Sequence, residues 1–242
     1  MSTGSSSAAV TVEVWPTPDG VLHFPLLTVM AAEQRVAAVL DGVAPGSAVV
    51  VSDPVVRDGL LGAGARQVRH VHTMRHRLSD VPAPSRPAGI GLRGWQDGDA
   101  ELLAPALVAA YGAGHPDQRD PDPAGAARSL AAMVDDLDNP LMPEGTRVAE
   151  SDDGPVGAAV VLRSLHVTGW TGPWLMNVFR HPTAAPSGPG AALVCGALTG
   201  LRDAGETHLG LAVTSSNPAR HTYERLGFGY DFEGWVLVLP PR

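Results

Sequence analysis

The sequence has a single cysteine, Cys195, among its 242 residues, so no disulfide bond can form within the chain. A small fold stapled by disulfides is therefore excluded, and we expect a reducing, cytoplasmic setting. Cys195 lies among Leu193, Val194 and Leu198 in a helical pattern. Such surroundings favour a packed core position over a nucleophile.

Long apolar runs and an excess of basic residues are absent as well. No uncharged apolar run reaches the roughly 18 residues of a membrane-spanning helix. Residues 1–8 lack the basic segment and apolar core of a signal peptide, and we expect residues 1–10 to form a disordered tail. The formal net charge is −8, whereas nucleic-acid binding usually needs a basic face. We therefore expect neither a membrane nor a nucleic acid as a partner.

The residues that are present are typical of a globular α/β protein, with 44% hydrophobic and 17% charged side chains. The first third predicts a helix over 31–43 and a buried strand over 47–52. A second helix is predicted to begin at Asp53-Pro54 and to end near Gly62 or Gly64, before a half-exposed strand over 68–78.

Three histidines of that last strand, His70, His72 and His76, share one face because side chains alternate along a strand. A metal site is one interpretation of them. However, no cysteine or carboxylate pattern accompanies them in the sequence, and the interleaved arginines would repel a cation. We therefore expect a solvated or interdomain strand, and no metal.

Residues 79–88, SDVPAPSRPA, contain four prolines and predict an extended linker. Beyond it, hydrophobic periodicity and turn residues predict the following elements: a strand over 89–93, a helix with Leu102, Leu103, Ala106, Leu107 and Ala110 on one face and Pro105 inside it, a polar loop over 111–123, a helix over 123–137, and strands over 147–151 and 156–163 joined at Asp152-Asp153-Gly154. The acidic loop from Asp117 to Asp122 is typical either of solvated surface or of a loop on the substrate side of a site.

A glycine-rich turn lies at the centre of the stretch 174–228. A predicted strand over 175–179 leads through this turn into a helix over 190–205. A second strand, 209–214, then precedes Ser216-Asn217-Pro218, the start of another helix. Glycine lets the backbone approach an anion, and the free N–H groups of a first helical turn point at it. The pattern therefore predicts a phosphate-binding turn.

Two parts of the chain, 31–78 and the C-terminal third, share one order of predicted elements. This order is a helix, a strand, a helix that begins with Asp-Pro or Asn-Pro, a glycine turn and a strand. One interpretation is a degenerate half-repeat, and the other is a coincidence that any α/β chain can give. The first copy has no Gly-x-Gly loop, and Gly59 falls nearest to the position that Tyr223 occupies in the second copy. The first copy is therefore expected to be structural.

Two motifs carry a family resemblance over about residues 89–239. In the first, Pro182 is followed by Ala185-Pro186-Ser187-Gly188-Pro189-Gly190. In the second, a strand over 209–213 is followed by Asn217, Ala219, Tyr223 and Gly227-Phe228. With these motifs the chain resembles the GCN5-related N-acetyltransferases, which use acetyl-coenzyme A. The first motif departs from the family at Ala185, where Gln or Arg is expected, and its two prolines lack N–H groups.

The resemblance implies a mixed-sheet α/β fold of acyl-CoA transferases in residues 89–242. Residues 11–80 lie outside the resemblance, and their pattern predicts a βαβαβ-like extension that the linker 79–88 joins to this fold. It implies acetyl transfer from acetyl-CoA, without a metal, to a primary amine that attacks the thioester directly, with Tyr223 as the general acid for the thiolate. Backbone N–H groups of the strand 175–180 would stabilise the oxyanion. The residues that the resemblance assigns to the cofactor are Val178, Phe179, Arg180, Ala185, Ser187, Gly188, Gly190, Ala191 and Asn217.

Several points stay open at this level. Many relatives carry a carboxylate about where Asn177 stands, and an amide cannot take up a proton at neutral pH. The base is therefore open among Glu150, His181, Asp231, Glu233 and a chain of waters. The acceptor is open among small-molecule and peptide amines, and homodimers are frequent in the family. The alternative to an enzyme is a non-catalytic acyl-CoA-binding module that senses or regulates.

Overall fold

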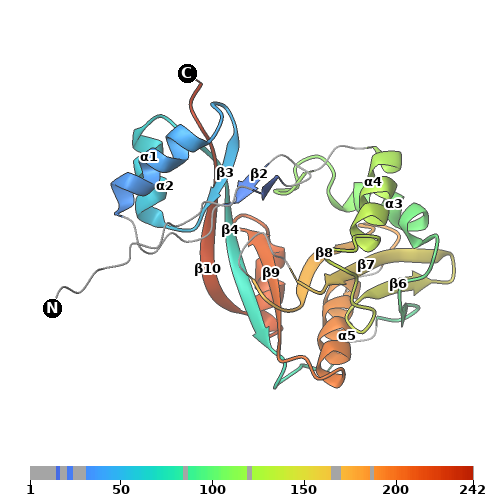
Figure 1. Cartoon of the computed structure of the whole chain (residues 1–242). Helices are drawn as coiled ribbons and strands as arrows, with labels where there is room; N and C mark the ends of the chain where they lie inside the picture. The colour runs from blue at the N-terminus through green and yellow to red at the C-terminus, as the bar shows by residue number, and fades with distance from the viewer. Residues whose placement is uncertain are drawn as a thin grey trace. The chain divides into compact units, whose positions relative to one another are not determined.

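The fold was analysed in a computed structural model that describes residues 15–16, 21–23, 31–83, 87–118, 122–164, 170–185 and 188–241. The chain divides into two compact units. The first unit contains residues 1–70, 167–169 and 233–242, and the second contains 71–166 and 170–232. The strands β4 (Arg66–Arg77) and β10 (Gly229–Val238) each contribute to both units (Figure 1). The tail predicted over residues 1–10 lies outside the described residues.

The first unit is a small α/β layer. Its elements are β1 (Trp15–Pro16), β2 (Val21–His23), α1 (Ala32–Gly42), β3 (Ala48–Val51) and α2 (Pro54–Gly62), with parts of β4 and β10. The strand order is β1-β2-β3-β10, in which β2 is parallel to β3 and β10 is antiparallel to it. Valine and leucine side chains from both helices pack on β3 and on the end of β10 to form the core. The predicted βαβαβ-like extension has one strand before its first helix, whereas the structure has two, β1 and β2.

The second unit contains most of the chain. Its further elements are β5 (Gly91–Arg93), α3 (Asp99–Ala110), α4 (Pro123–Val134), β6 (Arg147–Ser151), β7 (Gly154–Leu162), β8 (Trp174–Arg180), α5 (Pro189–Asp203), β9 (His208–Thr214) and α6 (Ala219–Arg225). The strand order is β4-β9-β8-β7-β6-β5. Only the pair β8 and β9 is parallel among these neighbours, so the predicted mixed sheet is confirmed. Across the described helices, none combines the length and the hydropathy that crossing a bilayer would require.

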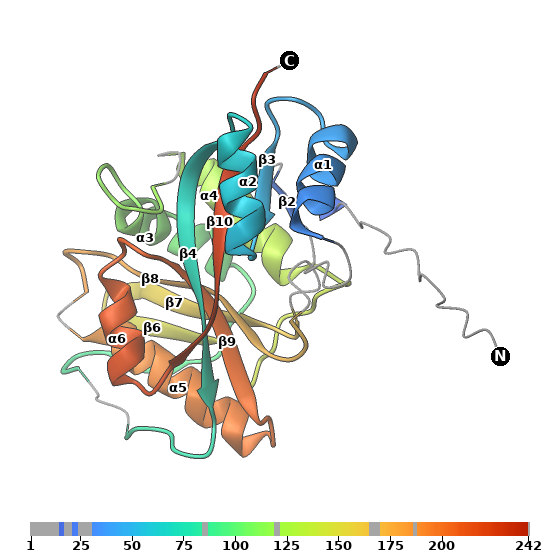
Figure 2. The same cartoon turned by 90° about the vertical axis from the view of Figure 1, so that its left-hand side faces the viewer.

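Helices cover both faces of this second sheet. The side chains of β7 alternate between the two cores, since Ala159 and Val161 pack on the side of α5 and Ala158 and Val160 on the side of α3 and α4. Figures 1 and 2 show α5 on one face, with α3 and α4 packed against each other on the other. Cys195 is buried in the α5 layer, and burial raises the pKa of its thiol, which agrees with the packing position predicted for it.

The predicted elements agree with the observed ones apart from a few boundaries and side chains. The helix predicted over 123–137 ends at Val134, because Asp136 accepts hydrogen bonds from the next turn of backbone and Leu137 is 93% exposed. The prediction that Leu102 faces the core is also wrong, since this side chain is 60% exposed. Pro105 lies inside α3, which runs on through it.

The two copies of the predicted half-repeat exchange their last strands. In the first unit, β3 pairs with β10 over Ala48–Val51, and in the second unit β9 pairs with β4 over His208–Thr214. The two helices that follow Asp53-Pro54 and Asn217-Pro218 are α2 and α6. Each is followed closely by a glycine with positive φ, Gly64 and Gly227 respectively. The hydrogen bonds at these two helix ends place Leu60, and not Gly59, at the position of Tyr223. Either residue leaves the first copy without a hydroxyl group there.

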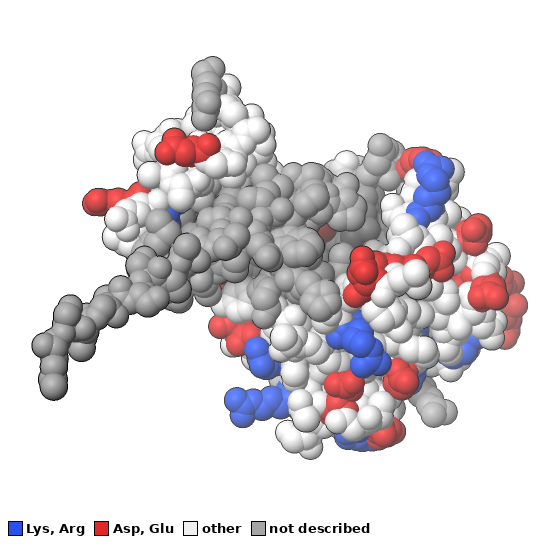
Figure 3. Space-filling model, in the orientation of Figure 1, with Lys and Arg blue, Asp and Glu red and all other residues white. Residues whose placement is uncertain are grey.

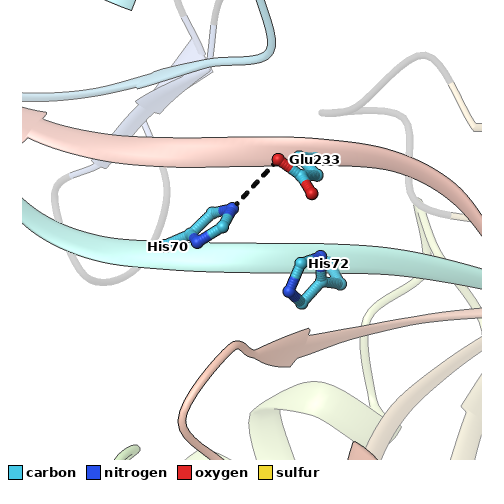
Figure 4. A group of neighbouring side chains, drawn as sticks. All are labelled: His70, His72 and Glu233. Carbon is cyan, nitrogen blue, oxygen red and sulfur yellow. Dashed lines mark hydrogen bonds and ion pairs between the residues drawn. The ribbon is translucent and has the colours of Figure 1, made fainter. Parts of the chain in front are cut away.

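The histidines of β4 have protein partners. In the first unit, His70 Nε2 lies 3.2 Å from Glu233 Oε2 (Figure 4). The His70 ring also stacks on Trp235, with ring centroids 5.3 Å apart. In the second unit, His72 and His76 are buried, in edge contact with Tyr230 and Phe228 respectively. The face that was expected to be solvated is buried by aromatic side chains at these two histidines, whereas the alternative expectation, an interdomain strand, stays a prediction.

Within the second unit, the side chain of Trp170 lies close against the backbone of Gly210. A Cβ atom at Gly210 would lie 2.4 Å from the indole ring. The ring is itself held by Trp174, by His208 and by the Arg75 guanidinium, which lies 4.3 Å above it. Only glycine fits at this position of β9.

We expect Gly210→Ala to lower the free energy of unfolding by about 1–3 kcal/mol, because the added methyl group overpacks a fixed ring. Denaturant unfolding followed by tryptophan fluorescence measures the change. Gly229→Ala is the matched control, since a Cβ atom there meets nothing within 4 Å. Equal effects of the two substitutions would contradict this account of Gly210.

His76 predicts a loss of stability in acid. Its burial lowers the pKa of the imidazole below the ordinary value of about 6.5. The unfolded chain therefore takes up the proton first, and the stabilisation from neutral His76 is present above about pH 6.5 and is lost as the pH falls through the depressed pKa. The free energy of unfolding should fall by up to about 1.4 kcal/mol per pH unit from this group. Urea unfolding at about pH 7.5 and pH 5.5 should show a smaller difference in stability between the two pH values for His76→Gln than for wild type. An equal difference in the two proteins would contradict this role of His76.

Candidate functional site

The site lies where the parallel strands β8 and β9 part from each other. In the part of the chain that is described, one ladder pair joins them, Trp174 with Gly210, next to a hydrogen bond from Gly210 N–H to Pro173 O. Beyond this pair, the facing edges of both strands have unpaired backbone groups. Open sheets bind ligands at the carboxyl ends of parallel strands. This opening is therefore the place to look for a ligand site.

The backbone of β8 offers some of these free groups. His181 N–H donates to Val156 O on β7, and Phe179 lies opposite Ala158 in the same antiparallel ladder. Hydrogen-bonded pairs alternate along such a ladder, so the backbone of Phe179 faces β7 while that of Val178 and Arg180 faces the opening. Of these three residues, which the resemblance assigned to the cofactor, two therefore present N–H groups there. The Phe179 side chain is buried in the layer below α3.

A β-bulge in β8 turns one side chain toward α3. Val160 pairs with Asn177 and Val161 with Leu175, so Met176 is the extra residue. Without the bulge Leu175 and Asn177 would share a face, but Leu175 packs on the α5 side while Asn177 points to Tyr111 at the end of α3. Asn177 is only 3% exposed. The bulge thus carries a polar side chain into the buried layer beside the opening.

Tyr111 fixes the orientation of the Asn177 carboxamide. The Tyr111 hydroxyl donates to Asn177 Oδ1 at 2.8 Å and also lies 3.3 Å from Val178 O. Asn177 Nδ2 is buried and makes no hydrogen bond with any described residue. An unpaired buried donor costs about 1–3 kcal/mol. Sequence reasoning singled out Asn177 only as a missing carboxylate.

Asp117 joins the polar loop to β9 and α6. Its carboxylate accepts a short hydrogen bond from the Thr214 hydroxyl and a second one, of 2.9 Å, from Asn217 Nδ2. Asn217 Oδ1 in turn accepts from Ala219 N–H in the first turn of α6. Both polar atoms of the Asn217 side chain, Nδ2 and Oδ1, thus form hydrogen bonds within the protein. Sequence reasoning placed Asp117 in an acidic loop but gave no sign of this partner set.

Tyr223 projects from α6 toward the same polar groups. Its ring packs against Phe228 with centroids 5.8 Å apart, and its hydroxyl makes no hydrogen bond with the described residues. Burial raises its pKa, and the nearby Tyr111 and Asp117 add to the shift. The hydroxyl therefore keeps its proton well above neutral pH and is available as a donor.

The turn before α5 offers a small set of free N–H groups. Gly188 caps the helix with a positive φ, Pro189 is the first helical residue, and Gly190 and Ala191 follow it with no partner in the helix. Ala185, which replaces the expected Gln or Arg, is buried in the core. The guanidinium of Arg180 reaches over the turn and donates to the carbonyls of residues 181 and 182. Ser187, the remaining residue predicted here, lies outside the described residues.

The predicted candidates for a general base are engaged elsewhere. Glu150 pairs with Arg93 and Asp231 with Arg75, while Glu233 pairs with His70 in the first unit. His181 Nδ1 accepts the backbone N–H of Ala184 at 3.0 Å and so caps its own turn. On the face shown in Figure 3, acidic and basic side chains are interspersed. The structure brings none of these four candidates into hydrogen-bond contact with Tyr223 or Asn177.

Comparison with known proteins identifies the fold. Neither a family model nor a curated protein sequence matches the chain. Among solved structures, a GCN5-related N-acetyltransferase from Sphaerobacter thermophilus has a TM-score of 0.70 at 19% identity, covering 95% of this chain and 77% of that one. Another from Kribbella flavida has a TM-score of 0.60 at 16% identity, with coverages of 92% and 81%. A tandem GNAT protein from the clavulanic acid biosynthesis pathway matches with a TM-score of 0.52 at 18% identity, over 78% of this chain and 62% of that one. At such identities the likeness shows the fold, which confirms the architecture that the resemblance implied.

The contacts of Asp117 predict a measurable local effect. We expect Asp117→Ala to lower the free energy of unfolding by about 1–2 kcal/mol, since two donors lose an acceptor that is partly exposed. Hydrogen exchange at the Ala219 amide and along the first turn of α6 should become faster. Asp152→Ala, at the exposed turn between β6 and β7, should leave both measurements unchanged. Unchanged exchange in α6 of Asp117→Ala would refute the anchoring role.

Proposed function

We propose that this chain, which has the fold of the GCN5-related N-acetyltransferases, transfers an acetyl group from acetyl-CoA to a primary amine. The observation that carries this proposal is the opening between β8 and β9, with free backbone groups on its edges and the protonated Tyr223 hydroxyl close to its end. An extended pantetheine arm can take the place of the missing strand pairs, because its amides match the backbone spacing of a strand.

The described residues fit acetyl-CoA in two regions. The N–H groups of Val178 and Arg180 face the opening, where they can bind the arm and the thioester oxygen. The N–H groups of Gly190 and Ala191 at the start of α5 can bind the pyrophosphate. Arg180 adds a positive charge beside that turn, which supports anion binding although Ala185 contributes no side-chain donor.

The chemistry follows from direct attack of the amine on the thioester carbonyl. As the tetrahedral oxyanion collapses, the C–S bond breaks and the thiolate takes a proton from the Tyr223 hydroxyl. The proton that the amine nitrogen loses as the amide forms returns to the Tyr223 oxygen through solvent, so no net proton is gained or lost. The raised pKa of this hydroxyl ensures that the proton is in place at neutral pH. Asn217 positions Tyr223 indirectly, since it caps the first turn of the helix that carries it.

The second candidate function is a non-catalytic acyl-CoA sensor. It is favoured by Ala185 and Pro189 in the loop and by an amide, Asn177, on the strand where many relatives carry a carboxylate. Both functions predict that CoA stabilises the chain, by about 2.7 kcal/mol at 100 times its dissociation constant. Only the enzyme releases thiol from acetyl-CoA in the presence of an amine.

We expect Tyr223→Phe to lower kcat by about 10²–10⁴, because the leaving thiolate loses its proton donor. The thermal shift with CoA should remain, since Phe keeps the packing on Phe228. The matched control is Tyr230→Phe, which removes the hydroxyl of an exposed tyrosine and should leave kcat unchanged. Thiol release from acetyl-CoA, measured with a panel of primary amines, distinguishes the acetyltransferase from the sensor. If wild type binds CoA but releases no thiol with any amine, the sensor is favoured.

A further inference from the structure

The Asn177 carboxamide presents only its nitrogen to a ligand. Its Oδ1 accepts the Tyr111 hydroxyl, and its Nδ2 is the buried polar atom that has no partner among the described residues. An amide nitrogen can donate but cannot accept. A ligand atom that satisfies it must therefore be a hydrogen-bond acceptor, such as the oxygen of a hydroxyl or carbonyl group.

The carboxamide lies beside the opening between β8 and β9. Its chain neighbour Met176, the bulged residue, is 40% exposed, and the next residue, Val178, turns its backbone toward the opening. The Tyr111 hydroxyl that holds Oδ1 lies 3.3 Å from Val178 O. Asn177, which is itself buried, thus lies between an exposed residue and a residue whose backbone faces the edge where the thioester is proposed to bind.

A carboxylate at this position would present acceptors, which suits an ammonium group or the uptake of a proton. The Asn177 carboxamide instead has a hydrogen-bond donor left over, because its oxygen already accepts the Tyr111 hydroxyl. Burying the nitrogen without a partner is unfavourable, so a ligand that supplies an oxygen gains more than one that supplies a methylene group. The polarity of the site therefore favours some acceptor amines over others.

We infer that Asn177 is a specificity-determining residue, whose Nδ2 donates a hydrogen bond to a hydroxyl or carbonyl oxygen carried by the acceptor near its amino group. The inference rests on the proposed function and names its substrate class: amino alcohols and amino-acid amides, rather than plain alkyl amines. Tyr111 is a positioning residue in this arrangement, because its hydroxyl holds the carboxamide oxygen.

The test compares acceptors in pairs of nearly equal size. Thiol release from acetyl-CoA is measured with 2-aminoethanol against n-propylamine, and with alaninamide against isobutylamine. Wild type should prefer the oxygen-bearing member of each pair by about 10- to 100-fold in kcat/KM, the range expected when one buried donor is left unpaired. In Asn177→Leu, which has a similar volume and no donor, the preference should fall to about 1- to 3-fold while turnover of the alkyl amines persists.

A second variant keeps the test independent of folding at position 177. Tyr111→Phe should lower the preference as well, because the carboxamide is then free to rotate. It should leave the KM for acetyl-CoA and the thermal shift with CoA unchanged. Asn177→Asp presents acceptors in place of the donor. It should therefore lack the wild-type preference for alaninamide over isobutylamine.

The outcomes are distinct. A wild-type preference that survives in Asn177→Leu, or a wild type that prefers the alkyl amines, would overturn the inference while leaving acetyl transfer intact. Absence of thiol release from wild type with every amine, together with a normal thermal shift for CoA, would overturn the proposed function and the inference with it.

Discussion

The arrangement of the second unit depends on the ladder pair that joins two parallel strands. β8 and β9 are joined at Trp174 and Gly210, and the indole of Trp170 lies against Gly210 on the same stretch of strand. Large aromatic side chains thus close one end of the strand pair. Among the described residues the ladder pairs these strands only there, so their other ends can stand apart, and the gap between them is the opening proposed to bind acetyl-CoA. A side chain larger than hydrogen at position 210 would push the tryptophan away and disturb the closed end.

The bulge at Met176 places a polar side chain, that of Asn177, beside this opening. A regular strand would have sent Asn177 into the apolar layer under α5, where a carboxamide has no partners. The extra residue reverses the alternation, so that Asn177 meets Tyr111 while Leu175 stays in the core. One inserted residue therefore decides whether the site has a polar wall. The same device exposes Met176 at the edge of the strand.

Much of the fold could be predicted from the sequence because its signals are local. Asp53-Pro54 and Asn217-Pro218 mark helix starts, and apolar runs mark buried strands, so the order of elements from residue 31 onward was found. The placement of Tyr223 and of the turn at Gly188 followed from motif spacing. The partners of Asp117 could not be found in this way, since Thr214 and Asn217 lie 97 and 100 residues further along the chain.

Other features were hidden for different reasons. A bulge changes no residue type, so the reversal at Asn177 has no signature in a pattern of apolar and polar letters. Leu137 continues a helical periodicity, but the local hydrogen bonds of Asp136 end the helix before it. The burial of His72 and His76 depends on aromatic residues of the C-terminal third. In each case a contact between distant residues, or a competing local bond, overrode the pattern.

The pairing of β3 with β10 and of β4 with β9 has a consequence for how the chain is made, whether or not the predicted half-repeat is real. β3 finds its neighbour β10, and β4 finds β9, only after more than two hundred residues have been synthesised. Until then the edges of β3 and β4 that these later strands will cover are unpaired. Unpaired strand edges are prone to pair with other chains. Contacts so distant in sequence also make for slow folding. Expression of this protein is therefore expected to be sensitive to the rate of synthesis and to chaperones, and neither half-repeat is a self-sufficient module that could be grafted onto another protein.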